Sequence, residues 1–150
     1  MVLMGQDKIE ALLHAATDAY HHAYAPYSQF AVGAAVLDEH GEIHSGCNIE
    51  NAAYPSGSCA EEQAIGSMVA HGGRQIRAIV IIGYSDQLIT PCGACRQRIR
   101  EFADIQTKIH ICHIEKGHQK TFTIEMLLPD SFGPENLSKK PEPKPKKEKQ

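Results

Sequence analysis

The sequence predicts a single α/β domain in which helices flank a mixed β-sheet, giving three layers. The chain has 150 residues, 42% of them hydrophobic, which suits one domain with a core of its own. Strand and helix patterns alternate along its second half, as is typical of layered α/β folds. A hairpin pattern precedes them, so the sheet should combine antiparallel with parallel pairs.

The first half of the chain predicts a helix followed by a β-hairpin. Apolar residues recur at three- and four-residue steps over Gln6–Ala25, which is the helical period, and Pro26 ends this segment. Phe30–Leu37 is rich in small and apolar residues and predicts a strand. Glu42–Ile49 returns beside it after a turn at His40-Gly41.

The second half predicts strands and helices in alternation. Ile76–Gly83 is a continuous β-branched run, typical of a strand covered on both faces. Two helices are expected, Cys59–His71 and Cys92–Ala103, and both should begin at one edge of the sheet, where open α/β sheets bind ligands. Lys108–Ile114 and Thr121–Ile124 predict further strands. Loops are expected at Asn51–Ser58, Ser85–Pro91 and Glu125–Leu137, the last with one helical turn.

The composition argues against a membrane protein and against a secreted one. The longest aliphatic run is Ile79–Ile82, whereas a membrane span needs about 20 apolar residues. Met1–Gly5 is too short for the apolar region of a secretory signal. We therefore expect a cytoplasmic protein whose 5 cysteines stay reduced. Their odd number favours metal binding or catalysis over a disulfide framework.

A tail rich in Lys and Pro, Ser138–Gln150, follows the domain of residues 1–137. The tail holds six Lys, three Pro and no aliphatic or aromatic residue, so it cannot bury enough surface to fold, and we expect it to be disordered. With two Glu, the tail carries a charge of +4. Since the net charge of the whole chain is −3, the other 137 residues carry −7. Such an acidic body is unsuited to neutralising phosphates, and no nucleic-acid polymer is expected as a partner.

Three cysteines are placed to bind one metal ion. Cys92 and Cys95 form a Cys-x-x-Cys motif at the start of an expected helix, which puts their sulfurs one turn apart, and Cys59 begins the other such helix. The positive end of a helix favours thiolate over thiol. A Zn²⁺ ion held by three protein ligands keeps a fourth position for water, which is the arrangement of catalytic sites.

Glu61 is the candidate for proton transfer at this ion. It lies two residues after Cys59, so on a helix it does not share the direction of that ligand but can reach the open position. Bound zinc lowers the pKa of water to about 7. A carboxylate beside that water can accept its proton and pass it on.

Other interpretations of the cysteines stay open at this point. Redox pairs and structural zinc sites share the Cys-x-x-Cys spacing. Cys47 and Cys112 lie in expected strands, where a free cysteine usually acts as a small buried hydrophobe. If either supplied a fourth sulfur, the site would be structural. The 9 His are scattered, and we interpret them as surface or polar-core residues.

Together these motifs resemble the zinc-dependent cytidine deaminases of the small, homotetrameric, three-cysteine type. Cys59-Ala60-Glu61 and Pro91-Cys92-Gly93-Ala94-Cys95 are similar to the signature of zinc nucleobase deaminases. Three further parts resemble the family in the expected order: Tyr27–Ala35 its first strand, Gly46–Ala52 its nucleoside-binding strand, and Leu127–Pro129 with Phe132–Pro134 its C-terminal segment. The resemblance implies a cytidine deaminase-like fold with one Zn²⁺ per subunit.

The resemblance also implies a role for each matching residue. Cys59, Cys92 and Cys95 would hold zinc, and Glu61 would transfer protons. Four residues would contact the nucleoside: Asn48 and Glu50 would bind the ribose hydroxyls, Phe30 would pack against the nucleoside, and the Ala60 N–H would meet the pyrimidine oxygen. Two residues would lie between subunits. Phe132 would reach into a neighbouring subunit's site, and Tyr54 would lie at a subunit contact. Core packing remains the alternative for both Phe residues, and a polar strand end for Asn48 and Glu50.

One position departs from the family pattern. The family usually has Arg directly after the catalytic Glu, where it donates hydrogen bonds to the zinc thiolates, whereas this chain has Glu62. An ionised carboxylate cannot donate, and three thiolates on Zn²⁺ already sum to a charge of −1. Three outcomes are open: the two helix N-termini suffice, Arg96 or Arg98 substitutes, or turnover is slower.

The expected reaction is hydrolytic deamination of free cytidine and 2′-deoxycytidine to uridine and 2′-deoxyuridine, with release of ammonia, as in pyrimidine salvage. Three alternatives remain. A deaminase of a nucleoside antibiotic such as blasticidin S shares the cysteine motifs but resembles this chain less at Asn48–Glu50. A deaminase of polynucleotide cytosine is opposed by the acidic body. A zinc-stabilised binding module without catalysis is made conceivable by Glu62.

Overall fold

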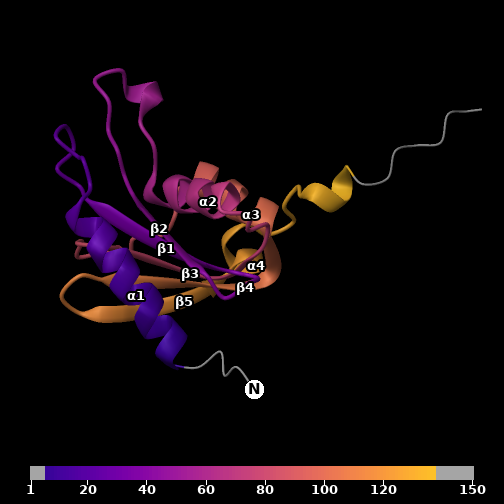
Figure 1. The fold of residues 1–150 in the computed structure, drawn as a ribbon. Helices are drawn as coiled ribbons and strands as arrows, with labels where there is room; N and C mark the ends of the chain where they lie inside the picture. The colour runs from indigo at the N-terminus through magenta and orange to yellow at the C-terminus, as the bar shows by residue number, and fades with distance from the viewer. Residues whose placement is uncertain (1–5, 138–150) are drawn as a thin grey trace, which may run out of the picture.

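The computed structural model describes residues 6–137, and the tail expected to be disordered, Ser138–Gln150, lies outside these described residues. In chain order the elements are α1 (Gln6–His21), β1 (Val32–Asp38), β2 (Ile43–Cys47), the 3-10 turn η1 (Tyr54–Ser56), α2 (Ala60–Ala70), β3 (Ile76–Gly83), α3 (Gly93–Phe102), β4 (Ala103–His113), β5 (Gly117–Thr123), α4 (Ile124–Leu127) and the 3-10 turn η2 (Pro134–Asn136). Figure 1 shows them gathered around one sheet.

The sheet has five strands in the order β2-β1-β3-β4-β5. Strands β3 and β4 run parallel, and the other three pairs are antiparallel. The parallel pair needs a crossover, which α3 provides. The predicted mixed sheet and hairpin are therefore confirmed, and β3 has the bounds that its β-branched run predicted.

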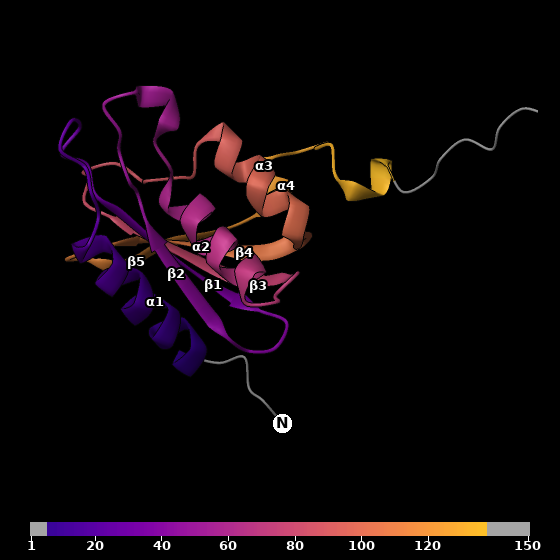
Figure 2. The ribbon, with the colours of Figure 1, turned by 45° about the horizontal axis from the view of Figure 1, so that its top comes forward.

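Helices cover both faces of the sheet, which makes three layers (Figure 2). On one face Leu12 and Ala16 of α1 pack against a core that includes Val80 of β3. On the other face α2, α3 and α4 pack over the preceding residue of that strand, Ile79. Because successive strand residues point to opposite faces, β3 contributes to both cores. This is why the run reads as continuously apolar.

Three element boundaries differ from the prediction by four or more residues. Helix α1 ends at His21 and not at Ala25, because Tyr24 leaves the helix to pair with Ile49. Strand β4 begins directly after α3 at Ala103, in a polar and largely exposed stretch that shows no strand alternation. Strand β5 begins at Gly117, on an exposed sheet edge that likewise lacks a buried face to mark it.

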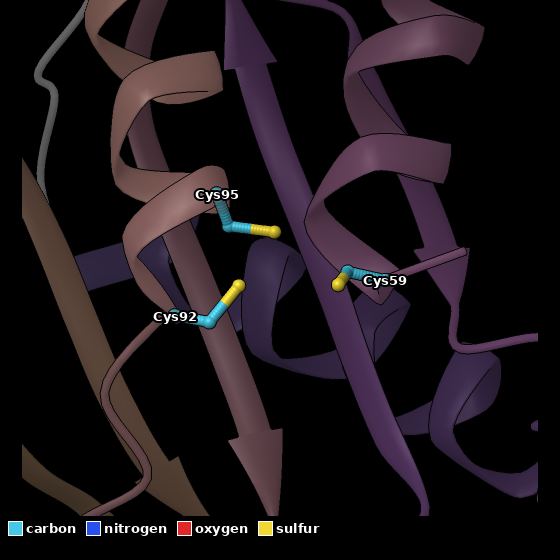
Figure 3. A group of neighbouring side chains, drawn as sticks. All are labelled: Cys59, Cys92 and Cys95. Atoms are coloured by element: carbon cyan, nitrogen blue, oxygen red, sulfur yellow. The ribbon is translucent and has the colours of Figure 1, made fainter. Parts of the chain in front are cut away.

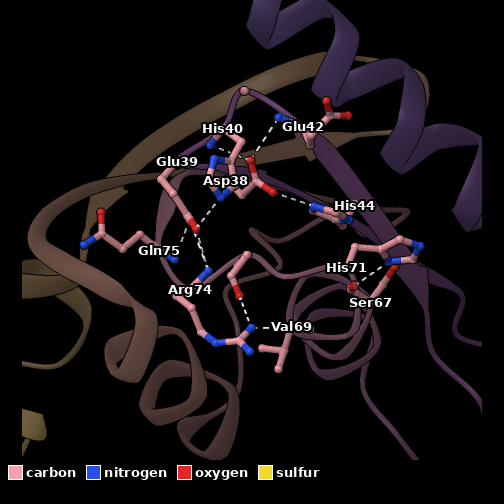
Figure 4. Close-up of polar contacts among 12 residues, drawn as sticks. Asp38, Glu39, His40, Glu42, His44, Ser67, Val69, His71, Arg74 and Gln75 are labelled. Carbon is pink, nitrogen blue, oxygen red and sulfur yellow. Dashed lines mark hydrogen bonds and ion pairs between the residues drawn. The ribbon is translucent and has the colours of Figure 1, made fainter.

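Hydrogen bonds of the β1–β2 hairpin tie it to the connection between α2 and β3 (Figure 4). Asp38 is 2% exposed, and its Oδ2 accepts a hydrogen bond from His44 Nε2 at 2.8 Å. The next residue, Glu39, accepts from the backbone N–H groups of Arg74 and Gln75 at 2.9 and 2.7 Å. The bonds of Glu39 therefore link the hairpin to the segment that directly follows the C-terminal end of α2. Within residues 6–137, no helix has the length and apolar character needed to cross a bilayer.

Candidate metal centre

Three cysteine sulfurs meet where α2 and α3 begin (Figure 3). Cys59 is the N-cap of α2, Cys92 is the N-cap of α3, and Cys95 lies in the first turn of α3. The Cys59 side chain makes no capping bond to its own helix, and all three thiols are free of disulfides. The three sulfurs lie within 4.8 Å of one another. Since Zn–S bonds are about 2.3 Å long, one zinc ion can contact all three, and the predicted convergence is confirmed.

A close backbone approach sets the position of Cys59. A Cβ atom built on Gly46 of β2 would lie 2.5 Å from the backbone N of Ala64 and 2.8 Å from the carbonyl O of Ala60. Only glycine fits this space without displacement of backbone. The first turn of α2 therefore rests directly on β2, which brings the preceding Cys59 to the edge of the sheet.

Arg96 holds the segment that leads into Cys92. Its Nε donates to the carbonyl O of Pro91 at 2.8 Å, and its Nη1 donates to the carbonyl O of Leu127 at 2.8 Å. A third bond reaches Thr90 Oγ1 at 3.2 Å. Arg96 thus holds the backbone beside Cys92 and makes no hydrogen bond to a sulfur.

The three thiols differ in their readiness to ionise. Burial raises the pKa of Cys59, and burial together with the nearby Glu61 carboxylate raises the pKa of Cys95. Burial acts on Cys92 too, but hydrogen bonds from the Cys95 backbone N–H and from the other two thiols outweigh it and lower the pKa of Cys92. A metal ion must displace protons from such a site, which couples metal binding to pH.

Glu61 lies beside the sulfurs on the wall of a cavity. Its side chain is 5% exposed, and it lies close enough to the Cys95 thiol to raise the pKa of that thiol. The cavity has a volume of about 640 Å³ and is lined by Glu61, Cys59 and Cys92 among others. This volume is in the range of small-molecule sites, which is roughly 300–1,000 Å³. A buried carboxylate next to a metal centre and open to a ligand cavity is suited to proton transfer.

The same cavity gathers most of the residues that the sequence singled out for substrate binding. Phe30, Asn48, Glu50, Tyr54 and Ala60 all line it. The residues come from three separate segments that meet because Ile49 pairs with Tyr24 on one side and with Ser58 on the other. Asn48 and Glu50 flank Ile49 in extended backbone, so their side chains share one face.

Asn48 and Glu50 also hold the cavity wall together. Asn48 Oδ1 accepts from the Val32 N–H at 2.9 Å, and its Nδ2 donates to the Phe30 carbonyl at 2.7 Å. Glu50 Oε1 accepts from the N–H groups of Tyr27 and Ser28 at 2.9 and 3.0 Å. Hydrogen bonds from the Ser28 hydroxyl and these N–H groups lower the pKa of Glu50, so this carboxylate is ionised at neutral pH.

Comparison with known proteins decides the family. Residues 6–111 match the family model described as the cytidine and deoxycytidylate deaminase zinc-binding region. The chain belongs to this family. It is 41% identical over 130 residues to a cytidine deaminase of Sporosarcina psychrophila, covering 87% of this chain and 95% of that protein. It is 36% identical over 129 residues to a cytidine deaminase of Halalkalibacterium halodurans, covering 86% and 97%.

Solved structures agree with the family assignment. The crystal structure of a cytidine deaminase from Burkholderia pseudomallei matches with a TM-score of 0.77 at 39% identity, covering 82% of this chain and 98% of that one. A cytidine deaminase from Mycobacterium tuberculosis matches with a TM-score of 0.70 at 35% identity, covering 83% and 96%. The zinc-binding region of the family and the cluster of three cysteines together support one zinc ion per chain as cofactor.

The cavity of this deaminase-family chain differs in two respects from what the sequence predicted. Ile89, Thr90 and Pro91 line the cavity, although the sequence predicted only a loop there. Their position directly before Cys92 is the signal that could have identified them. Phe132, by contrast, is 58% exposed and does not line the cavity of its own chain. Gln97 Nε2 fixes its backbone by donating to the carbonyl O at 2.9 Å.

The other two cysteines lie outside the zinc cluster of this deaminase-family chain. Among residues 6–137, the one group of three or more candidate ligands that lie together is Cys59, Cys92 and Cys95. Cys112 is 1% exposed in the core that faces α1, and Cys47 is half-buried at the end of β2. The structural, four-sulfur alternative is therefore not supported.

Burial of Cys112 predicts a loss of stability in alkaline solution. Desolvation raises the pKa of Cys112 to about 11 in the folded chain from an ordinary value of 9.0. The folded state favours the neutral thiol, so this contribution is complete below pH 9 and disappears as pH rises through 11. We expect the free energy of unfolding of the wild-type chain to fall by about 2 kcal/mol more between pH 8 and pH 11 than that of Cys112→Ala. Equal losses in urea denaturation would contradict this.

Proposed function

We propose that this chain is a zinc-dependent cytidine deaminase, which converts free cytidine and 2′-deoxycytidine to uridine and 2′-deoxyuridine with release of ammonia, in pyrimidine salvage. One observation carries the proposal: three cysteine sulfurs converge, and two of these cysteines, Cys59 and Cys92, line one nucleoside-sized cavity together with the buried Glu61. The relatives that bear the name cytidine deaminase span nearly the same length of chain.

Glu61 would move the protons of the reaction. Zinc held by Cys59, Cys92 and Cys95 supplies Lewis acidity at this point of the cavity. Glu61 takes one proton from the attacking water and returns it to N3 of the cytosine ring while the water oxygen bonds to C4. The second proton of the same water passes through Glu61 to the amino nitrogen as the C4–N4 bond breaks, which leaves uridine and ammonia.

The cavity wall supplies groups that match a nucleoside. Ala60 is the first residue of α2, and the N–H groups of a first helical turn have no partner within the helix, so its N–H is available to a pyrimidine oxygen. Glu50 is anionic and can accept from ribose hydroxyls, while Asn48 can both donate and accept. Phe30 offers an apolar ring at 41% exposure.

We also propose a homotetramer in which active sites are shared between subunits. Support comes from large apolar side chains that remain exposed beside the cavity, since such patches usually mark contacts. Tyr54 is 75% exposed and packs edge-on against Tyr27, with ring centroids 5.9 Å apart. We also propose a cytoplasmic location, where free thiols such as these three stay reduced.

Replacing Phe132 with Ala tests the shared site. If this ring reaches into a neighbouring cavity, its loss should raise the KM for cytidine by about 10-fold, as expected for an aromatic anchor at an interface. The mass in solution, measured by light scattering, reports on assembly. Met126→Ala is the matched control, because Met126 is equally exposed at 58% but lies on α4. Unchanged kinetics in Phe132→Ala would argue against a shared site.

A direct assay tests the proposed activity. We expect the absorbance of cytidine to fall as it becomes uridine, and a strong zinc chelator should stop the fall. The substrate panel contains cytidine, 2′-deoxycytidine, blasticidin S and a cytosine-containing oligonucleotide. Turnover of the antibiotic or the oligonucleotide alone would replace the proposal with one of those activities. Zinc binding without any turnover would identify a binding module.

A further inference from the structure

The metal centre places a surplus of negative charge at the junction of two helices. Three thiolates outnumber the two charges of Zn²⁺ by one, and Glu61 and Glu62 add two carboxylates in the first turn of α2. Cys95 is fully buried, so water does little to screen the charge on its sulfur. The N-termini of α2 and α3 offset part of this charge. A side-chain cation at the sulfurs would offset more.

Arg98 is that cation. It lies three residues after Cys95 on α3, a spacing that puts the two side chains on one face of the helix. Its Nη1 donates to Cys95 Sγ at 3.7 Å, a normal length for a hydrogen bond to sulfur. Among residues 6–137, the other two arginines of α3 are occupied elsewhere. Arg96 bonds to backbone carbonyls, and Arg100 bonds to Ser131 and Glu135.

Glu62 holds Arg98 from the other helix. Its Oε2 lies 3.7 Å from Arg98 Nη2, and the two side chains are each 39% exposed. An ion pair of this exposure contributes little stability by itself. Its geometric effect is larger, because it fixes the guanidinium so that one nitrogen faces the carboxylate and the other faces the sulfur. Glu62 is therefore compatible with a zinc site in which the cation comes from α3.

We propose that Arg98 is a positioning residue that donates to the zinc thiolate of Cys95 and offsets its charge, and that Glu62 acts through Arg98. The inference rests on the zinc site of the proposed function but not on its substrate. Residues that hydrogen-bond to metal ligands orient them and tune the metal, and their loss typically lowers metal affinity by about 10–100-fold.

The test is a zinc-affinity series on the full chain, measured by competition with a chromophoric chelator. We expect Arg98→Gln to bind zinc about 10–100-fold more weakly than wild type and Arg98→Lys to recover part of the loss. Glu62→Gln should lose less than Arg98→Gln. The double variant should bind as weakly as Arg98→Gln alone, because Glu62 has no effect once Arg98 is gone. Arg77→Gln is the control, since it removes the same charge from an exposed position on β3.

Several results would overturn the proposal. One is unchanged zinc affinity in Arg98→Gln, and another is losses that simply add in the double variant. A fall in the urea midpoint of the zinc-free protein that matches the fall in affinity would show a purely structural role. If Arg98→Gln does not fold, the zinc affinities of Arg98→Lys and Glu62→Gln decide instead, and wild-type affinity in both would overturn the proposal. Failure of the proposed function is separate, since a wild-type chain with this zinc pattern but no turnover of cytidine would overturn that function alone.

Discussion

Replacement of Glu61 by Gln is expected to remove nearly all turnover of cytidine while zinc stays bound. Glutamine keeps the size of the side chain, which is 5% exposed, but it cannot accept the proton of the attacking water or deliver it to N3. Loss of general acid–base catalysis typically costs about 10²–10⁴ in rate. Because Glu61 would serve two proton transfers, we expect the upper end of this range or more.

The measurement pairs initial rates with zinc content. Glu101→Gln is the matched control, since Glu101 is an exposed carboxylate on α3 and its replacement should leave both quantities unchanged. A Glu61→Gln chain with a near-normal rate would remove Glu61 from the mechanism. A variant that lost its zinc would show instead that Glu61 supports the metal centre.

Replacement of Cys95 by Ala is expected to abolish zinc retention, and activity with it. Cys95 contributes one of the three sulfurs, and no other His, Cys, Asp or Glu in residues 6–137 joins the cluster. The fall in zinc affinity should exceed the ~10–100-fold that follows removal of a residue bonded only to a ligand. Zinc content after dialysis against a weak chelator measures this directly.

Cys112→Ala provides the control for this experiment. Cys112 is 1% exposed and Cys95 is 0% exposed, so the two substitutions remove the same atoms from similarly buried places. Only the change at Cys95 should affect the metal. One zinc per chain in the dialysed Cys95→Ala protein would contradict the three-sulfur site, and so would loss of zinc from Cys112→Ala.

Much of the fold and of the metal site could be predicted from sequence because local patterns determine them. The β-branched run Ile76–Gly83 is a strand over its whole predicted length. The helices beginning at Cys59 and Cys92 were placed within one residue, since the cysteines are their N-caps. Their convergence followed from topology, because both helices start at one edge of the sheet.

Other features depend on contacts that no local pattern encodes. Strand β5 from Gly117 has no buried face, so its sequence lacks the alternation that marks a strand. The three-residue spacing from Cys95 favours Arg98 over Arg96 as the partner of that sulfur, but the contact of Arg98 with Glu62 depends on how α3 lies against α2, which periodicity does not determine. The resemblance gave Asn48 a role toward a ribose, but its bonds to Val32 and Phe30 became apparent only with the tertiary structure.

Those two backbone bonds of Asn48 restrict how the pocket can be redesigned. A substitution there would remove these two bonds at the start of β1 together with the proposed contact to a ribose, so weaker binding in such a variant could not be assigned to ribose recognition. Anyone adapting the pocket to a bulkier sugar would do better to begin at Phe30. Its ring is 41% exposed on the same wall, and trimming that ring would enlarge the pocket while keeping the amide clamp intact.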